Sequence, residues 1–551
     1  MIMDEKIKNS YKVVILTAGK GSRLGNRTTY FNKALLRVGD KAVISHTIDQ
    51  FPTETEFIIA VGYKGDVVKQ YLQIYHSDRK FTFVDVDKYS EPGSGPGYAM
   101  IKCKEHLQCP FYFISCDSII KWKEIWLHNW SDLTQDFQNV NWGGISKIDL
   151  SLKKHYCTVS SAIIEKKLDN RGLGAITSVH DKDEKGTEFA FTGVAFIKNY
   201  VDFWKKLKYA QPTVNEEIQI APVVLQFDKV YGLEVDWWDT GNEEGLQKAR
   251  EHFKGIQNLD KVDEEIYVNE ESGFVVKYFH NENMVKYRVE RTKKLGDTVP
   301  KIISCSKNFY KYEYVKGQDL FKIDNQHEIM KDLLNYTQKN LWTDVKLKNY
   351  DELIFDDICK NFYHDKTMSR LNKAHEQLGI SDTEHIINNR EVPSLKYMFE
   401  RMNWKEICHG IPSNIHGDWN FSNIVFTPEK TFKFLDWRQD FGGLLDYGDR
   451  YYDFAKMYAC LLWPHNSVKN NQYSINIEDD FWIHIPDTLL KCSNILTKWL
   501  FDNGYDVRKA NILTSIVWLN MSPLHEFPLN KHLYFYGKLH LYESLIGKKY
   551  E

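Results

Sequence analysis

Residues 15–25 read ILTAGKGSRLG, and this glycine-rich stretch overlaps the apolar run VVIL at residues 13–16. Glycines between a buried strand and a helix let backbone N–H groups approach phosphate oxygens, because no Cβ stands in the way. Lys20 and Arg23 add positive charge to the loop. The stretch predicts a phosphate-binding loop at the end of a first strand, although three glycines alone are as typical of a structural turn.

Short apolar runs alternate with helical patterns up to about residue 250. The runs EFIIAVGY (56–63) and FTFVDV (81–86), for example, are each followed by an amphipathic segment. This alternation predicts βαβ units, and hence an α/β domain whose doubly wound, mostly parallel sheet is Rossmann-like. Ligands of such sheets bind at the carboxyl ends of the strands, which is where the glycine-rich loop lies.

The pattern changes after residue 252. Residues 265–279, EIYVNEESGFVVKYF, read as two strands around a turn, and the chain is mostly helical from about residue 325. One loop–strand–turn–strand segment, at residues 415–437, interrupts the helices. We therefore predict two domains, residues 1–252 and residues 253–551, the second a bilobal, protein-kinase-like α+β domain.

Length and composition limit the classes of partner. A chain of 551 residues is too long for one hydrophobic core. Its 72 Lys and Arg against 75 Asp and Glu give a net charge of −3, which favours a small soluble substrate over nucleic acid or an anionic membrane. No window approaches the ~20 apolar residues that span a bilayer, and the nine cysteines form no CxxC pair. We expect reduced thiols and a cytoplasmic location.

The run AGKGSRL…NKALL at residues 18–36 resembles the signature of the nucleotidyltransferase superfamily that makes sugar nucleotides and related activated alcohols. That signature is a glycine-rich loop with Arg, followed by Pro-Lys-x-Leu. Further matches follow in the family's order: GSGPGYAM (93–100), SCDSII (115–120), FTGVAF (191–196) and WWDTGN (237–242). The resemblance covers about residues 11–250 and implies a nucleotidyltransferase fold.

The resemblance also implies roles for individual residues. Joining a phosphate monoester to an NTP brings two anions together, which calls for Mg²⁺ and for cations. Asp117 and Asp239 would hold Mg²⁺, and Arg23 and Lys33 would be the catalytic cations. The residues expected to bind the nucleotide are Gly19, Lys20, Gly21, Ser22 and Gly95. Those expected to bind the acceptor are Gly193 and Lys182, with Lys185 as the alternative to Lys182.

Two departures from the family pattern leave the acceptor and the base open. Asn32 stands where the family has Pro before the lysine, and no Leu-x-Pro-Leu-Thr continuation follows Leu24. Structural alternatives also exist for the two carboxylates. Asp117 could be a turn residue at a strand end, and Asp239 a helix N-cap.

Residues 415–443, IHGDWNFSN…FKFLDWRQDFGG, carry a second constellation. Asp418, then Asn423, then Asp436 after a strand have the order of a kinase catalytic loop, in which one Asp accepts the hydroxyl proton while Asn and a second Asp hold Mg²⁺. The His-Gly-Asp form resembles the aminoglycoside phosphotransferase and choline kinase family. GDRYYDFAKM at residues 448–457 is similar to that family's Asp-Arg-x-x-Asp-Leu-Ala segment.

This second resemblance implies a lysine and a partner acid for ATP. Lys277, in GFVVKYF, is the candidate lysine, and Glu290 is its candidate partner, with Glu282 the less favoured alternative. Residues 310–320 would form the hinge strand that receives the adenine. Four tryptophans in the helical part are candidates for a quaternary-ammonium cage or for core positions: Trp463, Trp482, Trp499 and Trp518.

Together the two resemblances predict a bifunctional, cytoplasmic enzyme. The C-terminal domain would phosphorylate the hydroxyl of a sugar, polyol or amino alcohol with ATP. The N-terminal domain would couple the phosphate to a second NTP, with CTP favoured, for surface glycan or lipid head-group synthesis, and Mg²⁺ would serve both sites. The alternatives are a choline kinase–phosphocholine cytidylyltransferase, or a nucleotidyltransferase with a kinase-like module that only binds or regulates. A homo-oligomer remains open.

Overall fold

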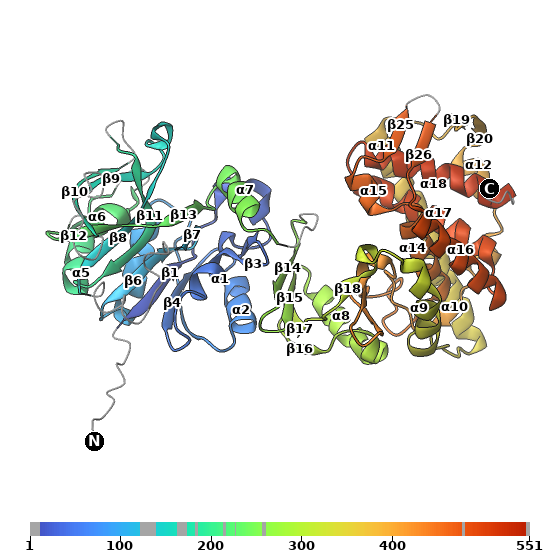
Figure 1. The fold of residues 1–551 in the computed structure, drawn as a ribbon, viewed down its shortest axis with the longest axis horizontal. Coiled ribbons are helices and arrows are strands. Elements are labelled where there is room, and N and C mark those ends of the chain that lie inside the picture. Colours follow the sequence, from blue (N-terminus) through green and yellow to red (C-terminus); the bar gives the residue numbers. More distant parts are fainter. Residues whose placement is uncertain are drawn as a thin grey trace, which may run out of the picture. The chain divides into compact units, whose positions relative to one another are not determined.

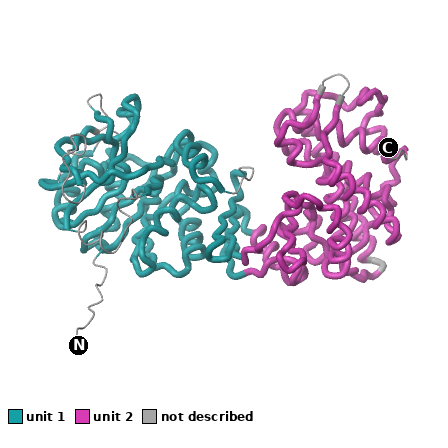
Figure 2. The backbone as a smooth tube through the Cα atoms, viewed as in Figure 1, with its two compact units in different colours: residues 1–282, 303–312 teal, residues 283–302, 313–551 magenta. Residues whose placement is uncertain are grey.

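The computed structural model describes residues 11–121, 139–161, 173–181, 186–212, 216–225, 227–255, 261–476 and 480–546 (Figure 1). The chain divides into two compact units (Figure 2). Unit 1 comprises residues 1–282 and 303–312, and unit 2 comprises residues 283–302 and 313–551. Within the described ranges, no helix is long and apolar enough to cross a membrane.

A nine-stranded sheet forms the centre of unit 1, in the order β5-β4-β1-β6-β11-β8-β12-β10-β9. Its strands are β1 (Lys12–Leu16), β4 (Glu56–Val61), β5 (Lys80–Asp85), β6 (Phe111–Ser115), β8 (Asn141–Lys147), β9 (Cys157–Ser161), β10 (Gly174–Asp181), β11 (Phe189–Ile197) and β12 (Val230–Glu234). β1 lies between β4 and β6 and runs parallel to both, so its carboxyl end opens into the glycine-rich loop.

The sheet is mixed, which corrects the expectation of a mostly parallel one. β5, β4, β1 and β6 are parallel, but β11 is antiparallel to both β6 and β8. β9 and β10 are also antiparallel to each other, and among the described strands of this half only β8 and β12 pair in parallel. Apolar runs alone do not distinguish the two directions, because a strand buried on both faces has the same composition either way.

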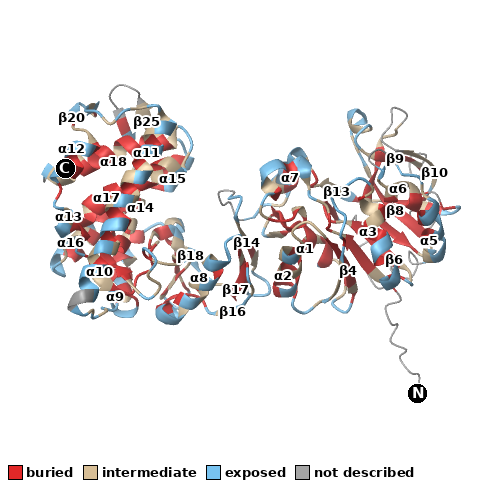
Figure 3. Ribbon diagram, turned by 180° about the vertical axis from the view of Figure 1, so that it is seen from behind, coloured by how far each residue is buried: buried red, intermediate tan, exposed pale blue. Residues whose placement is uncertain are grey.

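Helices cover both faces of the sheet, because apolar side chains of β1 point alternately to one face and to the other. Val13 and Ile15 pack into one core layer, together with apolar residues of α1 (Val43–Ile48) and α2 (Gly65–Tyr75). Val14 packs into the opposite layer, with α3 (Pro96–Cys103), α5 (Tyr200–Tyr209) and α6 (Ile220–Leu225). Figure 3 shows this buried material, in red, along the strands and the inner helix faces. The doubly wound arrangement follows from side chains that alternate between faces.

A four-stranded sheet, in the order β14-β15-β17-β16, follows α7 (Glu243–His252). Its strands are β14 (Glu264–Asn269), β15 (Phe274–Phe279), β16 (Ile302–Cys305) and β17 (Phe309–Glu313). The Tyr267 hydroxyl donates to the Leu35 carbonyl at 2.7 Å, and the Tyr278 hydroxyl to the Tyr30 carbonyl at 2.8 Å. These contacts tie the sheet to unit 1, and the first stretch of unit 1 ends at residue 282. The domain boundary expected from the sequence, between residues 252 and 253, lies before this sheet.

Unit 2 is mostly helical around a small sheet, in which β18 (Gln318–Asp319) pairs with the hairpin of β22 (Ile424–Phe426) and β23 (Phe432–Phe434). This hairpin is the strand–turn–strand expected from the sequence. The longer helices are α8 (Glu282–Leu295), α9 (Gln326–Asn340), α10 (Asn349–Lys360), α11 (Lys366–Leu378), α14 (Arg450–Leu462), α16 (Asp487–Asp502), α17 (Val507–Met521) and α18 (Leu529–Ile546). A π-helical turn, Asn361–Asp365, joins α10 to α11.

A buried ion pair attaches β14 to the glycine-loop region of unit 1. Arg37 Nε lies 2.8 Å from Glu265 Oε1, and the two side chains are only 8% and 10% exposed. Arg37→Met would leave the Glu265 carboxylate buried without its cation. We expect this change to lower the free energy of unfolding by about 3 kcal/mol in urea titrations of the full chain.

The exposed helical pair Glu244–Lys248 provides the control. Lys248→Met should leave the free energy of unfolding nearly unchanged, since exposed ion pairs contribute little. The double variant Arg37→Met/Glu265→Met should recover most of the loss. Equal stabilities of Arg37→Met and Lys248→Met would contradict this account of the hairpin's attachment.

Candidate active site

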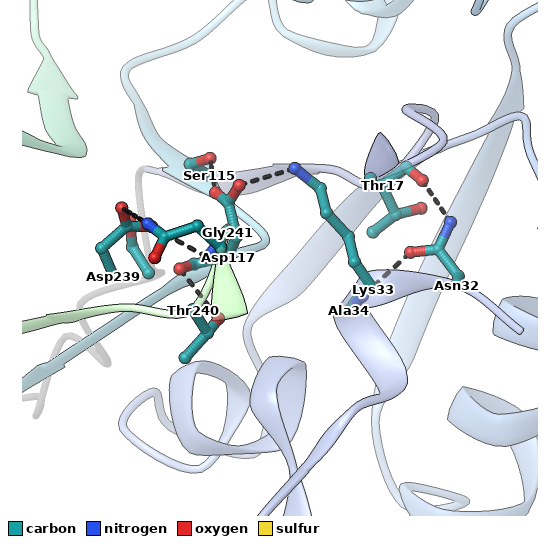
Figure 4. Close-up of polar contacts among 12 residues, drawn as sticks. Thr17, Asn32, Lys33, Ala34, Ser115, Asp117, Asp239, Thr240 and Gly241 are labelled. Atoms are coloured by element: carbon teal, nitrogen blue, oxygen red, sulfur yellow. Dashed lines mark hydrogen bonds and ion pairs between the residues drawn. The ribbon is translucent and has the colours of Figure 1, made fainter. Parts of the chain in front are cut away.

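Lys33 and Asp117 form a close ion pair at the carboxyl end of the sheet (Figure 4). Asp117 follows β6 after one residue, and Lys33 begins the short helix η2 (Lys33–Leu35). The Lys33 Nζ lies 2.6 Å from Asp117 Oδ2, and the Ser115 hydroxyl donates to Asp117 Oδ1. Both side chains are largely buried. The structure thus brings together two residues that the sequence predicts for one site.

The ion pair keeps both groups charged despite their burial. Burial alone would raise the pKa of Asp117, but the Lys33 ammonium outweighs it and lowers that pKa to about 2. Burial would likewise lower the pKa of Lys33, and the Asp117 carboxylate raises it above its ordinary value. Asp117 is therefore an ionised carboxylate at any physiological pH.

Asp239 is positioned beside Asp117 by strand pairing. β13 (Asp236–Asp239) runs antiparallel to β7 (Ser118–Lys121), with Asp239 opposite Ser118. Asp239 Oδ1 accepts from the Gly241 N–H at 2.8 Å, and the Tyr156 hydroxyl donates to Oδ2 at 2.9 Å. Burial and the neighbouring Asp117 carboxylate raise the pKa of Asp239. The two carboxylates thus have opposite pKa shifts.

Gly241 marks the space on which the charged groups converge. A Cβ built at Gly241 would lie 2.8 Å from Asp117 Oδ2, 3.0 Å from Asp239 Oδ1 and 3.1 Å from Arg23 Nη2. Two carboxylates and a guanidinium therefore face one small volume. Mg²⁺ is commonly held by one or two carboxylates together with substrate phosphates, so this donor set fits Mg²⁺. No cluster of three or more ligating His, Cys, Asp or Glu side chains occurs in the described ranges.

The glycine-rich loop closes over Lys33. Gly21 has a φ of 69°, and a Cβ there would lie 3.1 Å from Lys33 Cβ, so both the backbone and the space favour glycine. The 3₁₀ helix η1 (Ser22–Thr28) begins at the next residue. Nothing lies within 4 Å of a Cβ built at Gly19, and Lys20 and Arg23 are exposed. The loop therefore presents two cations beside open space.

Asn32 occupies the position where the family pattern has Pro. Its side-chain amide donates to the Thr17 carbonyl at 2.7 Å and to the Tyr63 carbonyl at 2.8 Å, and its Oδ1 accepts from the Ala34 N–H at 2.9 Å (Figure 4). The side chain is fully buried. Asn32 thus fixes the start of η2, and with it Lys33, by hydrogen bonds that proline could not make.

Of two further predicted residues, Gly193 adjoins the site next to Ser115, whereas Gly95 lies at the start of a helix beside Glu217. Gly193 in β11 has a φ of 77°, and a Cβ there would lie 2.9 Å from Ser115 Cβ. Gly95 precedes α3 with a φ of 110°, and a Cβ there would meet Glu217 Cβ at 3.1 Å. The alternative acceptor lysines, 182 and 185, lie outside the described residues.

Residues 13–135 match the family model described as the MobA-like NTP transferase domain. The chain is 22% identical over 249 residues to the Bifunctional protein GlmU of Methanococcus vannielii, covering 44% of this chain and 54% of that protein. It is 39% identical over 66 residues to the probable glucose-1-phosphate cytidylyltransferase of Bacillus subtilis, covering 12% of this chain and 26% of that protein. The chain thus spans about half or less of these relatives, and its N-terminal part is similar to nucleotidyltransferases.

Solved structures similar to this chain include a UDP-glucose pyrophosphorylase in complex with UDP-glucose. That likeness has 18% identity and a TM-score of 0.38, and covers 44% of this chain and 98% of that structure. A putative glucose-1-phosphate thymidylyltransferase from Bacillus anthracis is 22% identical with a TM-score of 0.36. That likeness covers 46% of this chain and 98% of that structure.

Unit 2 brings Asp418 and Asn423 together with a lysine that sequence reasoning missed. The Asn423 amide donates to Asp418 Oδ2 at 2.9 Å, and Lys456 Nζ of α14 lies 2.7 Å from Asp418 Oδ1. Burial would raise the pKa of Asp418, but Lys456 outweighs it and holds that pKa below its usual range. Lys456 directly follows the Asp-Arg-x-x-Asp-Phe-Ala segment, yet that pattern gave no sign of its contact with Asp418.

The loop that carries Asp418 is fixed by a buried acid, Asp453. Its carboxylate accepts from the backbone N–H groups of His416 at 2.8 Å and Gly417 at 2.7 Å, and from Trp342 Nε1 at 2.9 Å. Burial raises the pKa of Asp453 to about 6, although these three hydrogen-bond donors act in the opposite direction. The buried Asp453 carboxylate therefore fixes the conformation of the backbone turn before Asp418.

Asp436 forms an ion pair with Arg288 of α8, a partner not predicted from the sequence. Asp436 has a φ of 58°, a left-handed conformation uncommon outside glycine. Glu290, two residues after Arg288, is exposed. Lys277 lies on β15 in unit 1, whereas Glu290 and Asp436 belong to unit 2, so the predicted ATP-binding set divides between the two units.

The four tryptophans considered for a cage do not contact one another in the described part of unit 2. Trp463 Nε1 donates to His532 Nδ1 at 3.0 Å, and Trp518 Nε1 to the Ala459 carbonyl at 3.3 Å. Trp499 stacks on Tyr505, and Trp482 is exposed. Trp463, Trp499 and Trp518 are buried, as expected for core positions, whereas Trp482 is not.

The raised pKa of Asp239 predicts a gain in stability when its charge is removed. A carboxyl group whose pKa is higher in the folded state than in the unfolded state destabilises the fold when ionised, at pH values above both. Asp239→Asn should therefore raise the melting temperature by a few degrees at pH 7.5 with EDTA, and the gain should shrink as the pH falls toward 4.

Asp236, exposed on the same strand, gives the matched control. Asp236→Asn should leave the melting temperature unchanged at every pH. A lower melting temperature for Asp239→Asn than for Asp236→Asn at pH 7.5 would show that hydrogen bonding, rather than charge repulsion, governs this position.

Proposed function

We propose that unit 1 transfers a nucleotidyl group from an NTP to a sugar phosphate and releases pyrophosphate. The arrangement around Gly241 supports this most strongly, because two carboxylates and Arg23 face one small volume beside the glycine-rich loop. A structural turn or a helix cap needs neither two convergent carboxylates nor a buried lysine ion pair. The similarity of residues 13–135 to NTP transferases is consistent with it.

The chain's own residues would act mainly on charge. In the reaction a phosphate oxygen of the acceptor forms a bond to the α-phosphorus, the bond from that phosphorus to the bridging oxygen breaks, and pyrophosphate leaves with the electron pair. Arg23 and Lys33 would offset the negative charge that accumulates on the phosphates. Mg²⁺ bound by Asp117 and Asp239 would supply Lewis-acid screening of the same oxygens. The nucleotide would be bound by Gly19, Lys20, Gly21, Ser22 and Gly95. The acceptor would be bound by Gly193 and Lys182.

The relatives suggest a sugar 1-phosphate as acceptor. Three matched proteins are named as glucose-1-phosphate cytidylyltransferases, one of them as probable, and another is named as a UTP–glucose-1-phosphate uridylyltransferase. CTP is the NTP that we favour, because the cytidylyltransferases have the higher identity. An activated sugar or polyol for surface glycan or lipid head-group synthesis would be the product.

We further propose that unit 2 phosphorylates the free alcohol that unit 1 later uses. Asp418, fixed by Asn423 and by the Asp453-bound turn, would accept the hydroxyl proton as the alcohol oxygen bonds to the γ-phosphorus of ATP and ADP leaves. Asn423 and Asp436 are the oxygen donors that would hold Mg²⁺. The assignments of Lys277, in unit 1, and of Glu290, in unit 2, to the nucleotide stay predictions from the sequence.

A binding or regulatory module is the second candidate for unit 2. The ion pair of Asp436 with Arg288 favours it, since a metal–nucleotide complex would have to take over that carboxylate. The two candidates differ in turnover: only the kinase consumes ATP in the presence of a free alcohol.

A pyrophosphate-release screen tests the transferase. Four NTPs are assayed against a panel of sugar 1-phosphates and polyol phosphates, and at least one pair should give turnover, with CTP the best nucleotide. Asp117→Asn should reduce this rate by about 100-fold or more, because Lys33 loses its partner and the metal a ligand. Asp236→Asn, on the strand of Asp239, should retain the wild-type rate. Full activity of Asp117→Asn would refute the assigned site.

The kinase is tested by ATP consumption with free alcohols. Asp418→Asn should reduce this rate by about 100- to 10,000-fold, the range for loss of a general base, while pyrophosphate release from the phosphorylated alcohol continues. Asp332→Asn, at an exposed position of α9, is the matched control. If ATP consumption is unchanged in Asp418→Asn, or absent from the wild type with every alcohol, unit 2 is a binding module.

A further inference from the structure

Four cationic side chains from three separate segments of unit 2 are close enough to act on one another electrostatically, and two of them contact the loop that carries Asp418. Two belong to α11, one follows the second Mg²⁺ candidate, and one belongs to α14: Lys366, Arg370, Arg438 and Lys456. The transferase half has no part in this cluster. The proposed proton acceptance by Asp418 involves Lys456 but does not require the other three cations.

Arg438 and Lys456 lie directly against the catalytic turn. The Arg438 N–H donates to the His416 carbonyl at 3.0 Å, and a Cβ built at Gly417 would lie 2.7 Å from Arg438 Cβ. Lys456 Nζ is 2.7 Å from Asp418 Oδ1. Two cations therefore stand next to the group that would receive the hydroxyl proton.

An aromatic side chain connects these cations to α11. Lys366 Nζ lies 4.2 Å from the centre of the Phe362 ring, and Arg438 Cζ lies 5.2 Å from the same centre. Arg438 also contacts Tyr452, whose ring centre is 5.9 Å from its Cζ. Phe362 belongs to the π-helical turn before α11, and such turns occur frequently at functional sites.

The cluster has more positive charge than its protein partners balance. In the described part of unit 2, Lys456 has an ion-pair partner, but Lys366, Arg370 and Arg438 have no carboxylate within ion-pair distance. Burial, then Arg438 and Arg370, lower the pKa of Lys366 to about 7, and Asp440 opposes this only in part. Like charges gathered in a partly buried place are costly unless an anion accompanies them.

We infer that Lys366, Arg370 and Arg438 bind an anionic group, a carboxylate or a phosphate, on the alcohol that unit 2 phosphorylates. The inference rests on the proposed kinase function and adds the substrate class to it. Lys456 would keep Asp418 ionised while the hydroxyl is presented. An amino alcohol such as choline would bring a cation to a place that is already positive, and a neutral polyol would leave the charge unbalanced.

The position of the cluster favours the acceptor over ATP. Asp418 takes its proton from the acceptor, so the groups packed on Asp418 and its turn face the acceptor's side of the reaction. Asp436, which is proposed for ATP's metal, pairs with Arg288 and not with a cation of this cluster. Acceptor and nucleotide binding can be separated by their Michaelis constants.

The test measures ATP consumption by the full chain with three matched sets of alcohols: hydroxy acids, polyol phosphates, and neutral or cationic alcohols that include glycerol, ribitol and choline. The best acceptor should be a hydroxy acid or a polyol phosphate. Lys366→Met and Arg370→Met should each raise KM for it by about 10- to 100-fold, as expected for loss of a hydrogen bond to a charged group, with KM for ATP unchanged. Lys373→Met, exposed on the same helix, is the control and should match the wild type.

A neutral or cationic best acceptor whose KM is unaffected by Lys366→Met would overturn the inference and leave the kinase standing. A raised KM for ATP instead of the acceptor would also overturn it. Calorimetric titration with inorganic sulfate tests the anion site without turnover. The wild type and Lys373→Met should bind one more sulfate than Lys366→Met/Arg370→Met, and equal stoichiometry would contradict the inference even if no alcohol supports ATP consumption.

Discussion

Two neighbouring carboxylates at the carboxyl end of the sheet set the main constraint on unit 1. Asp117 and Asp239 repel each other, and Lys33 can neutralise only the first, at 2.6 Å. Asn32 fixes the segment that carries Lys33, and the β7–β13 pairing fixes Asp239. The residual charge beside Arg23 is what a divalent cation and a triphosphate together would balance. The fold thus maintains a charge imbalance that substrate binding would relieve.

Unit 2 also has an imbalance of charge around its candidate site, but there the excess charge is positive. Asp453 holds the turn before Asp418 with two backbone hydrogen bonds, and Lys456 neutralises Asp418 itself. The remaining cations exceed the nearby acids, which is the basis for an anionic acceptor. Phosphorylation of an alcohol that already carries a negative group gives a phosphate monoester, the chemical class to which the sugar phosphates proposed for unit 1 also belong. The two proposed reactions therefore share the phosphate monoester as their common chemical group.

The sequence predicted the first strand and the glycine-rich loop that follows it, because an apolar run, glycines and cations each have a local physical meaning. It also led to Asp117 and Asp239 through the order of family motifs, and the structure places these two together with Arg23 and Lys33. The antiparallel half of the sheet was missed, since composition does not distinguish strand direction in a buried sheet. The contacts of Asn32, Tyr156, Arg288 and Lys456 were missed as well, because each joins segments that are far apart in sequence and no periodicity records such a pairing.

The most direct test of the central claim is the binding of Mn²⁺, as a paramagnetic substitute for Mg²⁺, with a non-hydrolysable NTP present. The Asp436→Asn variant of the full chain removes one proposed ligand of the second site, so that electron paramagnetic resonance reports on unit 1. We predict one tightly bound Mn²⁺ in this background, retained on adding Asp236→Asn and lost on adding Asp117→Asn or Asp239→Asn. Equal Mn²⁺ binding in all of these variants would contradict the claim that Asp117 and Asp239 form a metal–nucleotide site.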